Sequence, residues 1–135
     1  DDYQTDILSA NTFDSINNAA LSEPVDMQGY QLVQILFDTL IVRIKAIKIA
    51  MYEGNIAHKG ALVNMSLDVL AELQHSLDKD IKEGAELVSN LQSLYEYMQS
   101  RLLVAHADNS VETLDEVLDV TYIIKEAWDQ LPDYL

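Results

Sequence analysis

The sequence predicts an all-α protein, an antiparallel up-and-down four-helix bundle with an N-terminal extension. Apolar side chains recur at spacings of three and four residues through most of the chain after residue 26. Only four Gly and two Pro occur in 135 residues, which leaves room for long uninterrupted helices. The breaks between the periodic segments are short, and short connections make consecutive helices antiparallel neighbours.

The first two helices are delimited by residues suited to helix ends. We expect the first helix to run from about Asp26 to Glu53. Gly54 follows it, and glycine readily adopts the left-handed conformation that ends many helices. Asn55 has a side chain suited to capping the next helix, which extends to about Leu77.

The third and fourth helices follow a charged stretch at residues 78–84, which is a turn or a helix start. The third helix is expected to end near Ala107. Asn109, followed three residues later by Glu112, has the spacing of a capping box, so it is expected to open the fourth helix. That helix ends near Gln130.

The N-terminal segment, residues 1–25, differs in composition from the bundle domain, residues 26–135. It is rich in Asn, Ser and Asp. Residues 12–21 have the pattern of a short extra helix, but their helix propensity is low, so we expect order only where this segment docks. The alternative is a frayed terminus.

Charge and composition exclude several classes of function. The chain carries 23 acidic and 8 basic residues, a net charge of −15, and such a surface repels a nucleic-acid backbone. Absence of Cys excludes disulfides and thiolate metal sites and fits a reducing compartment. No apolar run approaches the ~20 residues of a membrane span, and the first residues show no signal-peptide pattern. We therefore expect a protein of the cytosol that does not insert into membranes.

The sequence also lacks the motifs of an enzyme. It contains no Gly-rich phosphate loop, nucleophile elbow or His-Glu-x-x-His motif. Glu72 and His75 have the spacing used in di-iron bundles, but such a site needs two of these motifs and two further carboxylates. Neither His58 nor His106 has a Glu three residues before it. We expect no catalysis, no cofactor and no metal.

The first helix carries two apolar stripes on opposite sides when residues are projected at about 100° each. The core stripe consists of Val33, Phe37, Leu40, Ile44, Ile47 and Met51. The outer stripe consists of Leu32, Ile35, Val42, Ala46 and Ile49. A helix at the edge of a bundle buries only one stripe. The outer stripe is therefore covered by a further helix of a larger core, by a second subunit or by a separate partner.

The last two helices each show one apolar face. In the third, Tyr97 falls outside this face, next to Leu103 and Val104. The third helix is expected to bury Leu87, Val88, Leu91, Leu94, Tyr95, Met98, Leu102 and Ala105. The fourth is expected to bury Leu114, Val117, Leu118, Ile124 and Trp128.

Five short stretches, taken in order and spacing, resemble the flagellin-specific export chaperone family FliS. Leu-Val-Gln-Ile-Leu-Phe-Asp at residues 32–38 resembles the opening of the family's first helix, and Gly-Asn-Ile-Ala-His-Lys-Gly at 54–60 resembles the turn into its second. Leu-Tyr-Glu-Tyr-Met-Gln-Ser-Arg-Leu at 94–102 is similar to the family's Leu-Tyr-Asp-Tyr-Met segment. Leu-Asp-Glu-Val at 114–117 and Glu-Ala-Trp at 126–128 also fit.

This resemblance implies a four-helix bundle chaperone in the cytoplasm. Members of the family bind the disordered C-terminal segment of flagellin in apolar grooves, prevent premature polymerisation and present the client to the flagellar export gate. On this basis we expect the outer stripe, together with two tyrosines of the matched motif, to contact the client. The expected client-binding residues are Leu32, Ile35, Val42, Ala46, Ile49, Tyr95 and Tyr97.

The chain departs from the family pattern near its start. Tyr3-Gln4 is present, but the segment between this pair and the first helix is longer than the family pattern. In the family this segment can occupy the client groove and be displaced, so we expect a lid here. Its apolar side chains would be Ile7, Leu8, Phe13, Ile16 and Leu21. The alternative function is a homodimeric structural or signalling bundle without a flagellin client, which uses the outer stripe as its dimer interface.

Overall fold

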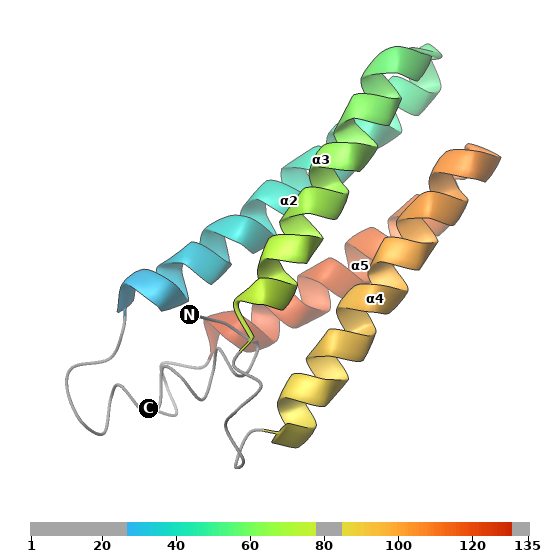
Figure 1. Ribbon diagram of the computed structural model, residues 1–135. Helices are drawn as coiled ribbons and strands as arrows, with labels where there is room; N and C mark the ends of the chain where they lie inside the picture. The colour runs from blue at the N-terminus through green and yellow to red at the C-terminus, as the bar shows by residue number, and fades with distance from the viewer. Residues whose placement is uncertain (1–26, 78–84, 131–135) are drawn as a thin grey trace.

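The computed structural model describes residues 27–77 and 85–130, which form four α-helices. Figure 1 shows two helical hairpins side by side, with the tight turn of each hairpin at the same end of the molecule. α2 packs against α3 and α5, and α4 packs against the same two helices, so the four form an antiparallel ring. This arrangement confirms the predicted bundle. The helices are α2 (Met27–Glu53), α3 (Ile56–His75), α4 (Ala85–Asp108) and α5 (Val111–Asp129).

The core lies between the four helices and is almost entirely apolar. All six residues of the core stripe are buried, as expected, and each contributes about 1.5–3 kcal/mol through burial. The buried hydroxyls of Ser66 and Thr121 donate to backbone carbonyls four residues earlier, at 2.9 and 2.8 Å. Leu87, expected in the core, is instead exposed in the first turn of α4.

The turn between α2 and α3 follows the prediction from Gly54 and Asn55. Gly54 has φ of 69°. Its N–H donates to the carbonyl of Met51 at 3.2 Å, and the N–H of Asn55 donates to Ala50 at 3.0 Å. This is the Schellman pattern, which satisfies the last carbonyls of a helix. The Asn55 side chain then caps α3 by accepting from the N–H of His58 at 3.1 Å.

The turn between α4 and α5 corrects the predicted capping box. Asn109 does not open α5; it has φ of 52° and ends α4 in a second Schellman pattern. Its N–H donates to His106 at 3.4 Å, and the N–H of Ser110 donates to Ala105 at 2.9 Å. Ser110 is the N-cap, accepting from the N–H of Thr113 at 3.1 Å. Asparagine tolerates the left-handed conformation, so it ends one helix while the next residue begins the other.

Lys59 connects the two tight turns. Its side chain is buried, and its ammonium group donates to the carbonyl of His106 at 3.2 Å and to Oδ1 of Asn109 at 3.0 Å. The carbonyls at a helix C-terminus carry partial negative charge, which favours a cation there. The start of α3 is thereby fixed to the end of α4.

Three predicted features lie outside the described residues, namely the charged stretch at 78–84, the short extra helix at 12–21 and the lid. The lid residues are Ile7, Leu8, Phe13, Ile16 and Leu21. Among the four helices that the structure describes, none combines the length and apolarity needed to cross a membrane.

Candidate functional site

The outer stripe of α2 is a row of exposed apolar side chains. Ala46 is half-buried and packs against the core, whereas the other four side chains face outwards. No described residue covers the outer stripe, so within this part of the chain α2 is not the central helix of a larger core. The exposed fractions are 52% for Leu32, 58% for Ile35, 65% for Val42 and 57% for Ile49.

An open groove of about 650 Å³ runs between α2 and α5, beside the outer stripe. Val42 belongs to both the stripe and the groove, and Tyr122 and Ile123 contribute further exposed apolar surface from α5. The sequence reasoning missed these two residues, although they fall between the buried positions Thr121 and Ile124. The groove is lined by Asp38, Ile41, Val42, Tyr122, Ile123, Lys125, Glu126, Asp129 and Gln130.

The apolar surface continues beyond the outer stripe to the α2–α3 turn. Tyr52 and Ile56 are the most exposed large apolar residues in the described ranges. Tyr52 follows Ile49 by three residues, so extending the same helical spacing by one turn would have identified it. Exposed large apolar side chains of this kind are typical of a protein-binding face.

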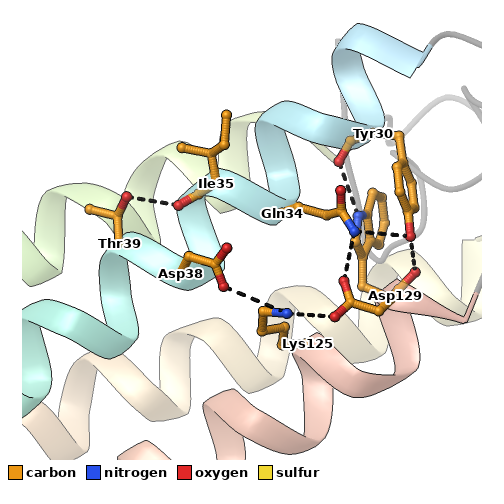
Figure 2. A network of polar contacts seen from close by, with 8 residues as sticks. Tyr30, Gln34, Ile35, Asp38, Thr39, Lys125 and Asp129 are labelled. Carbon is orange, nitrogen blue, oxygen red and sulfur yellow. Dashed lines mark hydrogen bonds and ion pairs between the residues drawn. The ribbon is translucent and has the colours of Figure 1, made fainter.

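A polar network joins the two helices at one end of the groove (Figure 2). The amide of Gln34 donates to Oδ1 of Asp129 at 2.8 Å. Lys125 pairs with the other oxygen of Asp129 and lies 3.6 Å from Asp38. The hydrogen bond to Asp129 raises the pKa of Lys125 above its ordinary value, so the ammonium form is favoured. These contacts fix the last turn of α5 against the first half of α2.

Two further lysines of α2 face α5, nearer to the tight turns. The ammonium of Lys48 donates to Oδ1 of Asp115 at 2.9 Å, and this hydrogen bond raises the pKa of Lys48. Lys45 instead lies over the ring of Tyr122, 5.6 Å from the ring centroid. This is a cation–π contact, worth about 0.5–1 kcal/mol at an exposed position.

The structure separates the two predicted tyrosines of α4. Tyr95 is completely buried and supports the core, so its side chain does not contribute to an exposed face. Tyr97 is exposed on the side of α4 that faces α5, and its hydroxyl donates to Oε2 of Glu116 at 2.6 Å. Arg101 donates to the other oxygen of Glu116 at 3.0 Å. Tyr97 therefore lies on a face separate from the outer stripe.

The described ranges contain no group of three or more His, Asp or Glu side chains that could hold a metal ion. Glu72 and His75 are both exposed on α3. The features with functional content are therefore the outer stripe, the groove beside it and the exposed Tyr97.

Comparison with known proteins places this architecture in a family. Residues 16–133 match the family model described as flagellar protein FliS. The chain is 34% identical over 103 residues to the flagellar secretion chaperone FliS of Vibrio cholerae, which covers 76% of this chain and 74% of the relative. It is 34% identical over 104 residues to the flagellar secretion chaperone FliSB of Pseudomonas aeruginosa, covering 77% and 81%.

A third relative extends the match along the chain. The flagellar secretion chaperone FliS of Salmonella typhimurium is 30% identical over 118 residues, covering 87% of this chain and 83% of the relative. With its four-helix ring, its matched motifs and these relatives, the chain belongs to the FliS family of flagellar proteins.

Proposed function

We propose that this protein is a cytoplasmic, non-enzymatic flagellar secretion chaperone that binds the disordered C-terminal segment of flagellin. Binding keeps flagellin from polymerising before export. The observation that carries the proposal is the exposed outer stripe beside an open groove in a chain of the FliS family. The proposed client contacts are Leu32, Ile35, Val42, Ile49 and the half-buried Ala46.

A disordered client requires an extended apolar surface. Ordering such a segment costs free energy, so the bound state must bury many side chains to be stable. Each exposed apolar residue of the outer stripe that a client covers contributes up to about 1.5–3 kcal/mol. A helix laid along α2, with its apolar side chains in the groove towards α5, would supply such contacts over several turns.

Tyr97 is proposed as a second contact, on the α4–α5 side of the bundle. A client that reaches both Tyr97 and the outer stripe wraps around α5, because α2 and α4 both pack against that helix. Tyr95 is left out of the proposed contacts because it is buried. The loaded chaperone would then deliver its client to a component of the export gate.

The lid remains part of the proposal and concerns residues before those described. Its apolar side chains would compete with the client for the outer stripe and would be displaced on binding. Deleting residues 1–24 should then tighten flagellin binding, measured by titration calorimetry. An affinity equal to that of the full chain would refute the lid.

The test of the main proposal is titration of the chain with a flagellin C-terminal peptide. Leu32→Ser and Leu103→Ser are matched variants because both leucines are 52% exposed, but Leu103 lies on α4, away from the outer stripe. Leu103 is also six residues from Tyr97, which places it about 120° around the α4 axis from that second proposed contact. We expect Leu32→Ser to weaken binding about tenfold, equivalent to ~1.4 kcal/mol, and Leu103→Ser to leave it unchanged. Absence of binding by the unaltered chain at micromolar concentration would overturn the proposal.

A homodimer that uses the outer stripe is the competing role. Analytical ultracentrifugation with and without the flagellin peptide separates the two. A chaperone should form a complex in which the peptide replaces any self-association through the outer stripe. A stable dimer that excludes the peptide would favour the structural or signalling role.

A further inference from the structure

The Lys and Arg side chains of the described residues fall into three groups. Three of them pair with carboxylates: Lys48 with Asp115, Arg101 with Glu116, and Lys125 with Asp129. Lys59 is buried and bonded to a carbonyl and an amide oxygen. Arg43 and Lys45 have no carboxylate partner within the described ranges.

This distribution is notable in a chain with 23 acidic and 8 basic residues, where carboxylates are abundant. Arg43 is half-buried and Lys45 is exposed, and both lie on α2 beside Val42. The two cations thus stand next to one of the most exposed members of the outer stripe.

Arg43 and Lys45 also lie on opposite sides of the outer stripe. Lys45 is on the side that faces α5, because its ammonium lies over Tyr122. Residues two apart on a helix differ by about 200° around the axis, so Arg43 projects from the side away from α5. A helix docked along the outer stripe would have one cation on each flank, near Val42 and Ala46.

We infer that the client segment seated on the outer stripe is an amphipathic helix with carboxylates flanking its apolar face, which pair with Arg43 and Lys45. This inference rests on the proposed function and names the chemistry of the segment that the outer stripe accepts. In coiled coils, charges on the flanks of an apolar seam set partner choice and orientation in this way. Here the two cations fix the register of the client along α2.

The two cations also offset the repulsion between this acidic chain and an acidic client. A net charge of −15 repels an acidic client at long range, and the pair supplies a local attraction where the client must dock. The alternative occupant is the N-terminal part of this chain itself, since residues 1–26 contain six acidic residues and no Lys or Arg. Removing the cations should weaken client binding if the client pairs with them, and strengthen it if the N-terminal residues do.

The experiment uses the full chain and a fluorescent peptide of the flagellin C-terminal segment, with affinity measured by fluorescence anisotropy at low and high salt. Arg43→Gln and Lys45→Gln each remove one positive charge. Asn64→Asp is the matched control, because it makes the same change in net charge at an exposed position of α3. We expect each Gln variant to bind about fivefold more weakly at low salt, with the difference lost at high salt.

Charge reversal sharpens the test. Lys45→Glu should weaken binding further, and a peptide in which one flanking acidic residue is replaced by Lys should restore it. Gln variants that bind the peptide as the control does would overturn the inference while leaving the proposed function intact. Tighter binding would also overturn it, because it would show that the acidic N-terminal residues occupy the cations. If the unaltered chain does not bind, the proposed function itself fails.

Discussion

Tyr30 of α2 and Trp128 of α5 each donate a side-chain hydrogen bond to the backbone carbonyl of the other. The Tyr30 hydroxyl donates to the carbonyl of Trp128 at 2.9 Å, and Nε1 of Trp128 donates to the carbonyl of Tyr30 at 3.2 Å. Their rings stack, with centroids 5.3 Å apart and planes inclined by 13°. Residues at the start of α2 and the end of α5 are thereby joined by two hydrogen bonds and one aromatic contact.

Replacement of Tyr30 by Phe should keep the ring stack and remove one of these bonds. The carbonyl of Trp128 would lose this donor, so the free energy of unfolding should fall by about 1 kcal/mol. Urea denaturation followed by circular dichroism measures this. Tyr52→Phe is the control, since the Tyr52 ring is exposed on α2. Equal midpoints for Tyr30→Phe and the unaltered chain would show that the hydrogen bond contributes nothing.

The fold could be predicted wherever a local sequence pattern is compatible with only one structure. Apolar spacing identified all four helices, and Gly54 could be read as a helix end because a φ of 69° costs glycine little. Asn109 was read wrongly because an asparagine can either cap a helix start or take the left-handed position after a helix end. Two contacts decide between these two roles: Lys59 bonds to the end of α4, and the adjacent Ser110 caps α5.

The candidate site was predictable only in part, for a related reason. Periodicity identified the outer stripe because its residues lie opposite a buried stripe on the same helix. A match to a family motif, however, includes every residue of the motif, whether its side chain is buried or exposed. Tyr95 and Tyr97 are two residues apart, so about 200° separates them around α4, and one is buried while the other is exposed. The contributions of Tyr122 and Ile123 depend on how α5 lies beside α2.

Ile47 and Ile49 should respond in opposite ways to the same substitution. Ile47 is completely buried, so Ile47→Ala should lower the free energy of unfolding by about 2–5 kcal/mol. Ile49 is mostly exposed, so Ile49→Ala should change it by less than about 0.5 kcal/mol. Urea denaturation of both variants, with flagellin peptide binding measured alongside, checks this. Ile49→Ala should lose affinity without losing stability, and a large loss of stability would mean that Ile49 is covered in the free chain.

Asn109 offers a test of the left-handed turn after α4. In Asn109→Ala, a side chain with no acceptor would occupy a φ of 52°, and the ammonium of Lys59 would lose one partner. We expect a loss of about 1–3 kcal/mol in the free energy of unfolding. Asn109→Gly loses the same acceptor but relieves the backbone cost, so it should be the more stable of the two. Thermal denaturation of both variants decides, and the reverse order would contradict a strained conformation.

Lys59→Met tests the connection between the two tight turns. Methionine can fill the volume of the lysine stem but donates no hydrogen bond, so the carbonyl of His106 and Oδ1 of Asn109 would lose their donor. A loss of about 1–3 kcal/mol is expected. Hydrogen exchange should show the effect mainly in the last turn of α4 and the first turn of α3. Uniform loss of protection over all four helices would indicate a general packing defect instead.

The stability of the protein should depend on pH through the hydrogen bonds that Glu116 accepts from Tyr97 and Arg101. The hydrogen bond from Tyr97, followed by that from Arg101, holds the pKa of Glu116 below its ordinary value of 4.5. A carboxylate with a lowered pKa stabilises the folded state above its unfolded pKa, and this contribution is lost as pH falls through the folded pKa. In Tyr97→Phe the pKa of Glu116 should rise towards 4.5, which carboxyl NMR titration measures directly.

The same variant makes a second prediction at alkaline pH. The hydrogen bond to Glu116 raises the pKa of Tyr97 above its ordinary value of 10.0. This contribution is present below pH 10 and is lost as pH rises through the folded pKa of Tyr97. The stability difference between the unaltered chain and Tyr97→Phe should therefore be largest between the pKa of Glu116 and the pKa of Tyr97. It should shrink as pH falls below the first and as pH rises above the second. A difference that stays constant from acid to alkaline pH would show that the hydrogen bond does not persist in solution.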